Sequence, residues 1–223
     1  MNSDVVRNQI ESFVNFALRA GFAIDANPVL KLTSNLRNRI TWSNNPRISD
    51  SFGKFATLDE YVAFVTRRDY NILLYDYSFI QLCYEFNRSE IVGHRLCYYP
   101  CPITFESSDF DNFNILELIS LLDGEAWQQR LRLRSPVRFD FDKKAVSLEH
   151  PASHFTICED SCRIPVHAPL SVGHFVKFIT RHFYPTIWKD HGEALAEIGN
   201  LQWNVTDSVS SVDELSLRWR RPD

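Results

Sequence analysis

Side chains suited to acid–base chemistry and phosphate binding crowd into one part of the chain, between residues 132 and 184. Imidazoles titrate near neutral pH and can transfer protons, and guanidinium groups can hold a phosphate in a fixed position. Together they could cleave RNA without a metal ion. The candidate catalytic residues are His150, His154, Arg138 and Tyr184, and the candidate binding residues are Arg134, Arg163, Asp140 and His182.

Each of these residues has a role in the hypothesis. His150 and His154 would be the acid and the base, Arg134 and Arg138 would clamp the phosphate, and Tyr184 would orient the substrate with its hydroxyl. The alternative is structural, because a histidine often hydrogen-bonds a turn or a buried carboxylate. The sequence leaves both interpretations open.

Three groups of residues could be considered as metal ligands, and each departs from the usual pattern. His150 and His154 are four apart, which suits zinc on a helix, but Pro151 and the neighbouring apolar residues favour an extended chain. The acidic group lacks the usual acid and lysine on the next strand, and the cysteine pairs are spaced more widely than most zinc knuckles. The acidic group is Asp140, Asp142 and Glu149, and the cysteine pairs are Cys97 with Cys101 and Cys158 with Cys162. We therefore expect no metal ion and no other cofactor.

Bulk composition excludes several classes of protein. Of the 223 residues, 44% are apolar and 13% aromatic, which is enough to build a buried core. The net charge of −4 argues against a protein that coats nucleic acid, although a basic patch lies between Arg130 and Lys144. The N-terminal residues do not resemble a signal peptide, and no apolar run is long enough to span a membrane. We expect a cytoplasmic protein.

Periodicity along the chain predicts an α+β fold, with a curved antiparallel sheet of five to six strands packed against several helices. Helices are expected over residues 3–20, 58–67 and 113–122 and after Ser171, and strands over 70–100 and 129–141. We expect a single domain over 1–223. It would comprise a helical N-terminal extension (1–56), a core that carries the motifs (57–185) and a C-terminal segment (186–223).

Several short motifs in the core resemble a known bacterial family. The segments DYSFIQLCYEF, HRLCYYPCP, RSPVRFDFD, HPASHFTI, CRIPV and HFVKFITRHFY are similar to the family catalogued as domain of unknown function 2290, over roughly residues 57 to 185. The RFDFD and HPASH block also shows a fainter similarity to TumE-like toxins. The positions that match the family motifs are Arg138, Asp140, His150, Pro151, His154, Arg163, Pro165, Phe183 and Tyr184, whereas the cysteine pairs do not look like a family feature.

The resemblance implies a function, because members of this family lie beside a helicase gene in the phage-defence cassettes of some bacteria. We expect an antiphage defence protein that acts with a helicase-type partner and binds RNA or single-stranded DNA through its Arg/His cluster. The same cluster could also cleave the bound strand. The alternative is a non-catalytic adaptor that docks on the helicase or on a phage component. Exposed aromatic side chains would serve such an interface, and the candidates are Tyr98, Tyr99, Trp127, Trp188, Trp203 and Trp219.

Overall fold

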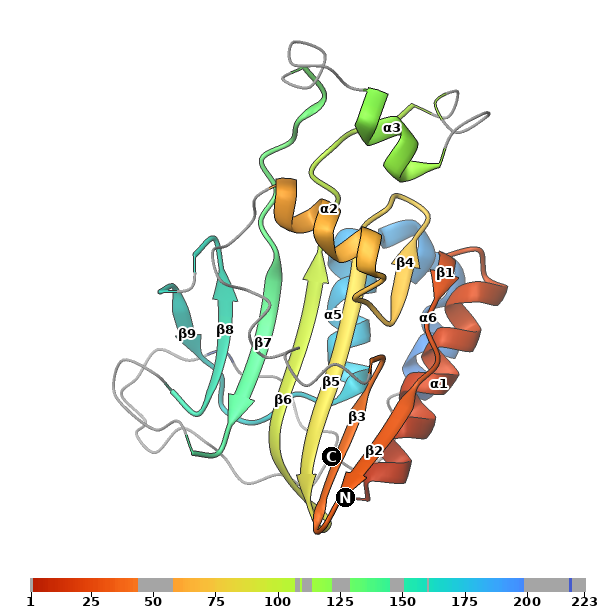
Figure 1. The fold of residues 1–223 in the computed structure, drawn as a ribbon. Helices are drawn as coiled ribbons and strands as arrows, with labels where there is room; N and C mark the ends of the chain where they lie inside the picture. The colour runs from red at the N-terminus through yellow and green to blue at the C-terminus, as the bar shows by residue number, and fades with distance from the viewer. Residues whose placement is uncertain are drawn as a thin grey trace.

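An antiparallel sheet forms the centre of the computed structural model, which describes residues 2–43, 58–106, 109, 114–121, 129–144, 151–159, 161–198 and 217 (Figure 1). Within these residues the sheet has nine strands, in the order β1–β4–β5–β6–β7–β8–β9, and β3 links the hairpin partner β2 to β5. The predicted α+β class is confirmed, and the sheet is larger than expected. The strands are β1 (Ala23–Ala26), β2 (Leu30–Ser34), β3 (Arg37–Thr41), β4 (Ile72–Leu74), β5 (Phe79–Asn87), β6 (Glu90–Tyr99), β7 (Val137–Asp142), β8 (Ser153–Ile157) and β9 (Arg163–Pro165).

Strand β5 pairs with three strands, and two of them, β3 and β4, share one of its edges. Its first residues, Phe79 and Ile80, pair with β4, while residues 84–87 pair with β3. The whole of its other edge pairs with β6. The chain from 70 to 100 is therefore the antiparallel meander that its apolar runs and short polar turns predict.

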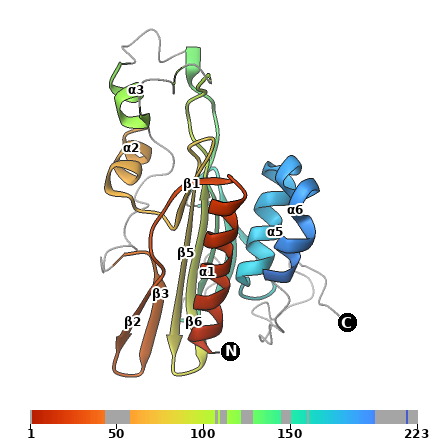
Figure 2. The ribbon, with the colours of Figure 1, turned by 90° about the vertical axis from the view of Figure 1, so that its right-hand side faces the viewer.

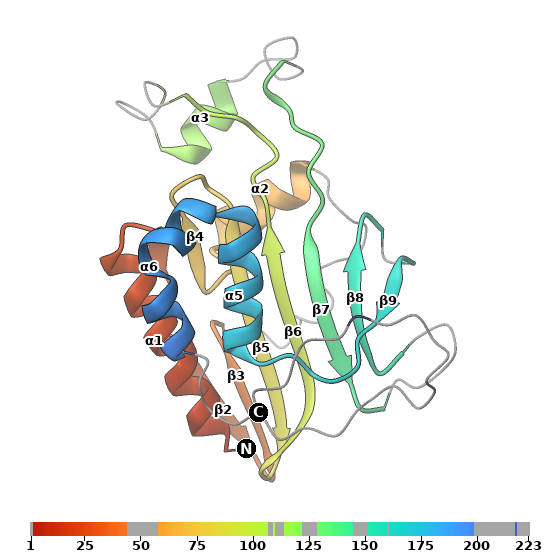
Figure 3. The same ribbon diagram turned by 180° about the vertical axis from the view of Figure 1, so that it is seen from behind.

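Five helices are found in the described part of the chain: α1 (Ser3–Arg19), α2 (Leu58–Arg67), α3 (Ile115–Leu121), α5 (Val172–Phe183) and α6 (Pro185–Ile198). Helices α1, α5 and α6 cover one face of the sheet, and α2 and α3 lie on the opposite side near one end (Figures 2 and 3). We call the first the helix-covered face. Its core includes Phe13 of α1, Phe175 of α5 and Leu82 of β5, all fully buried.

The helix boundaries follow from local signals in the sequence. Helix α1 ends before Gly21, whose φ of 66° is accessible to glycine at little cost. Its N-cap is Asn2, because the Asn2 side chain accepts the hydrogen bond from the Asp4 amide. Ser171 caps α5 as predicted, accepting from the amide of His174.

Two segments differ from their predictions. Residues 1–56 contain more than a helical extension, since β1, β2 and β3 all join the central sheet. The predicted strand 129–141 begins only at Val137, and before it the chain makes one isolated bridge, between Leu131 and Ile103. Alternation alone does not make a strand of residues 130–134. Among the described residues no segment pairs with them beyond that bridge, and Leu133 is fully exposed.

The face opposite the helix-covered face carries two kinds of residue. Near one end, α2 packs Tyr61 and Phe64 against Phe79 and Tyr99 of the sheet. Further along the strands the same face carries polar residues, and we call this part the arginine face; it comprises Arg39, Cys83, Arg95, Arg138, Asp140, His154 and Arg163. In the part of the chain that the structure describes, no helix has both the length and the hydropathy needed to cross a bilayer.

Candidate functional site

Asp140 is the centre of an ionic network on the arginine face. It lies in β7 opposite Arg95 of β6 and His154 of β8, so strand register brings all three side chains to one face. Arg95 Nε lies 3.1 Å from Asp140 Oδ1, and Arg138 donates to Oδ2. His154 Nε2 lies 3.6 Å from the same Oδ2. Three of the sequence-predicted site residues, Arg138, Asp140 and His154, therefore do converge.

The network is buried except for Arg95, whose side chain is half-buried. The exposed fractions are 9% for Asp140, 5% for Arg138 and 3% for His154. Burial alone raises the pKa of Asp140, but the charges of Arg95 and Arg138 and the nearby His154 outweigh it, and the pKa lies below its ordinary value. Asp140 is therefore a carboxylate at neutral pH, neutralised by the guanidinium groups around it.

Both ring nitrogens of His154 face groups of the protein. Its Nδ1 lies 2.9 Å from the carbonyl oxygen of Pro151, which can only accept, so Nδ1 carries a proton. Its Nε2 faces Asp140. The carbonyl therefore sets the tautomer. In the histidine–aspartate pairs of hydrolases the carboxylate accepts from Nδ1–H and leaves Nε2 for the reacting group, whereas in this protein Nε2 faces the carboxylate.

Tyr184 belongs to a second network, on the helix-covered face. It lies between α5 and α6, and its hydroxyl is 3.0 Å from both carboxylate oxygens of Asp76. The hydroxyl of Tyr98 is 3.1 Å away, and Ser78 donates to Asp76 from its amide and its hydroxyl, each at 3.1 Å. Burial, with Tyr98 and Asp76 adding to it, raises the pKa of Tyr184, so its hydroxyl stays protonated.

The sheet therefore separates residues that the sequence hypothesis placed in one site. Tyr184 and His182 lie on the helix-covered face, away from His154. His182 is exposed at the end of α5, with its ring 5.2 Å from that of Phe178. Arg134 is exposed just before β7 and donates to the carbonyl of Cys101 at 3.4 Å.

The remaining predicted residues can be placed only in part. Arg163 is half-buried in β9, opposite Thr156, and strand register puts it on the arginine face. His150, like Glu149 of the acidic group, lies outside the described residues. Of the predicted interface aromatics, Tyr98 and Tyr99 are buried and Trp188 is half-buried. Trp127, Trp203 and Trp219 lie outside the described residues.

The metal alternatives gain no support. Within the described ranges, no three His, Cys, Asp or Glu side chains gather where they could hold a metal ion. The first cysteine pair, Cys97 and Cys101, is buried, whereas Cys158 is exposed and Cys162 half-buried. Burial raises the pKa of Cys97 to about 12 and that of Cys101 to about 11. Both are therefore protonated at neutral pH, whereas zinc binds the thiolate form.

Sequence reasoning missed two hydrogen bonds that hold Leu170, on the connection that leads into α5, against the sheet. We call them the Leu170 clamp. Tyr84 and His94 are paired across β5 and β6, and both reach Leu170. The hydroxyl of Tyr84 donates to the Leu170 carbonyl at 2.9 Å, and the Leu170 amide donates to His94 Nε2 at 2.9 Å. Even spacing of His94, Leu96 and Tyr98 in an apolar strand was the signal that His94 faces the core. Burial lowers the pKa of His94 to about 4, and the charge of Asp140 opposes this effect only in part.

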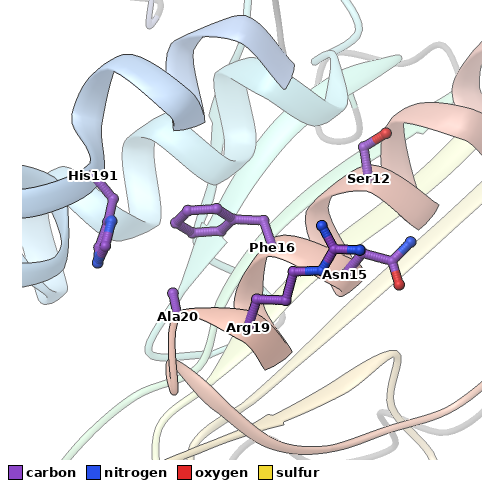
Figure 4. Close-up of a pocket in the computed structure, with 6 residues that line it drawn as sticks. All are labelled: Ser12, Asn15, Phe16, Arg19, Ala20 and His191. Atoms are coloured by element: carbon purple, nitrogen blue, oxygen red, sulfur yellow. The ribbon is translucent and has the colours of Figure 1, made fainter.

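A shallow groove lies between α1 and α6 (Figure 4). Its volume is about 500 Å³, and the His191 ring meets the Phe16 ring edge-on, with centroids 5.5 Å apart. Ser12, Asn15, Arg19 and Ala20 complete its lining. None of the residues singled out in the sequence lines this groove.

Comparison with known proteins adds a family. A family model with the description "Uncharacterized conserved protein (DUF2290)" matches residues 22–216, a longer stretch than the motifs suggested. The chain belongs to this family. Searches of curated proteins and of solved structures found no significant match. The DUF2290 match includes both networks and the Leu170 clamp, whereas α1 precedes it.

Proposed function

We propose that this DUF2290 protein is a non-catalytic binding module of a bacterial antiphage defence system. It would act in the cytoplasm with a helicase-type partner and engage nucleic acid without cutting it. The defence role and the partner rest on the family resemblance of the motifs. The choice of binding over cleavage rests on one observation, the burial of His154 between Pro151 and Asp140.

General acid–base catalysis requires a proton-transfer group that can reach the scissile bond. His154 is 3% exposed, and each of its ring nitrogens faces a protein group. Tyr184, the proposed orienting hydroxyl, lies across the sheet and binds Asp76. The arrangement favours a structural role for both residues. The ionic network then fixes the register of β6, β7 and β8, and the tyrosine network joins the helices to the sheet.

Cleavage remains the rival function, since Arg138, Asp140 and His154 do meet on one face. The test is incubation of the purified protein, with and without its helicase-type partner, on labelled RNA and single-stranded DNA. We expect the protein to bind and the strands to stay intact. The variants to compare are His154→Ala and, as a control at an exposed histidine, His182→Ala.

The outcome that would overturn the proposal is strand shortening that disappears in His154→Ala but persists in His182→Ala. Thermal unfolding of both variants must accompany the assay, because His154→Ala removes a buried group. Loss of cleavage counts only if the variant is folded at the assay temperature. The proposal would also be refuted if the protein bound neither RNA nor single-stranded DNA, whether alone or with its partner.

A further inference from the structure

Three exposed side chains lie at one corner of the molecule, where α5 ends beside the first residues of β7 and the β4–β5 turn. They are Tyr75, Arg134 and Phe183, and we call them the corner surface. Tyr75 is 49% exposed and Phe183 is 41% exposed. None of these three side chains has a role in the proposed function.

Ring contacts show that the corner surface is continuous. The Phe183 ring is 4.8 Å from Tyr98, and the Tyr75 ring is 5.9 Å from Tyr184, between centroids. Tyr98 and Tyr184 hydrogen-bond each other, so they form a single floor below the two exposed rings. Figure 3 shows the end of α5 beside the upper ends of β6 and β7. The exposed aromatics are thus held by a fixed base rather than by mobile loops.

Arg134 gives this aromatic surface a positive charge. Its guanidinium group donates to the Cys101 carbonyl, a neutral acceptor, so the contact positions the charge without cancelling it. It lies close enough to Tyr98 to oppose the rise in pKa that burial causes at that hydroxyl. The half-buried carboxylate of Asp76 is also nearby, and it accepts from Tyr184 and Ser78.

We infer that the corner surface binds single-stranded nucleic acid, with bases stacked on Phe183 and Tyr75 and a backbone phosphate at Arg134. Unpaired bases of any sequence can stack on exposed aromatic rings, while bases within a duplex are stacked on each other and unavailable. The corner surface offers one arginine for phosphate in a protein of net charge −4, whereas duplex binding uses many phosphate contacts. This inference rests on the proposed function and assigns it a surface and a class of ligand.

The test is fluorescence anisotropy with the full-length protein and short labelled oligothymidine, oligouridine and a matched duplex. Comparison of the first two probes distinguishes DNA from RNA as the preferred strand. We expect binding to one or both single strands and much weaker binding to the duplex. Phe183→Ala should weaken single-strand binding by about 5- to 150-fold, the range for loss of one stacked base.

Arg134→Gln should weaken binding and reduce the slope of log affinity against log salt by about 0.7, the contribution of one phosphate contact on a single strand. Matched controls lie at the hairpin turns at the far end of the sheet. Arg88→Gln removes an exposed arginine from the β5–β6 turn, and Leu36→Ala removes an exposed apolar side chain from the β2–β3 turn. Both should bind like the parent protein.

Each result separates this inference from the proposed function. Tight single-strand binding that Phe183→Ala and Arg134→Gln leave unchanged would overturn the corner site and leave the proposed function standing. Loss of helicase-partner binding in these variants, with nucleic-acid binding intact, would make the corner a protein interface and overturn the inference. Absence of nucleic-acid binding by the parent, with and without the partner, would overturn both. Thermal unfolding shows whether Phe183→Ala, which also loses its contact with Tyr98, is folded.

Discussion

The clamp on Leu170 predicts a specific loss of stability in acid. His94 Nε2 accepts the Leu170 amide, so the ring must be neutral with its proton on Nδ1. Protonation would remove the acceptor and place a charge in a buried site. The pKa of His94 in the folded protein is about 4, against about 6.5 for an ordinary histidine in the unfolded chain.

The sign and size of the effect follow from that difference. Because the unfolded state binds the proton more readily, stability is lost as the pH falls below about 6.5, and the loss levels off below about 4. At 1.36 kcal/mol per pKa unit, the free energy of unfolding should fall by about 2 kcal/mol between pH 7 and pH 5 and by about 3 kcal/mol at pH 4. This is a large fraction of the stability of an ordinary domain.

Urea denaturation at a series of pH values measures this change directly. His94→Gln is the matched variant, because its side-chain oxygen can accept the Leu170 amide but does not titrate in this range. All other titrating groups are common to both proteins, so the difference between their pH profiles isolates His94. We expect the parent to lose about 2 kcal/mol more than His94→Gln between pH 7 and pH 5. Equal losses of stability in the two proteins would refute the conclusion that His94 is buried in its neutral form.

Three further predictions concern the ionic network, the tyrosine network and the thiols. Asp140→Asn leaves buried Arg138 and half-buried Arg95 without their carboxylate and should lower the free energy of unfolding by about 3–5 kcal/mol in urea denaturation; a loss below about 1 kcal/mol would contradict the network. Tyr184→Phe removes a hydroxyl bound to a carboxylate and should cost about 1.5–3 kcal/mol in the same assay, while unchanged stability would mean that this bond contributes nothing. In the folded protein a thiol reagent should modify Cys158 first and Cys162 more slowly, with Cys97 protected until unfolding; mass spectrometry of the labelled peptides would expose any other order.

Local patterns in the sequence predicted many of the elements. The capping serine of α5, the glycine after α1 and the polar turns around β5 are short-range signals, and the structure has helices and strands where they indicate. Period-2 alternation likewise explains why Arg138 and Asp140 share a face. Segment 30–41 lies in the predicted helical extension, yet it forms the β2–β3 hairpin, and β3 pairs with β5. Pairing with a strand so far along the chain is not encoded in the local composition.

The division of the candidate site by the sheet could not be read from the sequence. Tyr184 follows His154 by only thirty positions, but the intervening chain passes from β9 into α5, and α5 packs on the face opposite His154. The partners of Tyr184, namely Asp76 and Tyr98, lie 108 and 86 positions earlier in the chain. Such contacts depend on which face a helix covers, and neither spacing nor composition encodes that choice locally.

Helix α1 has an implication for how this fold varies among relatives. It precedes residues 22–216, the stretch that the family model matches, yet Val6, Ile10 and Phe13 are fully buried. Removing the helix would uncover the strands beneath it and the sides of α5 and α6. A homologue that retained only the matched stretch would have to cover this apolar surface with another segment or a second polypeptide chain. The region before residue 22 is therefore where such proteins should differ in architecture and in oligomeric state.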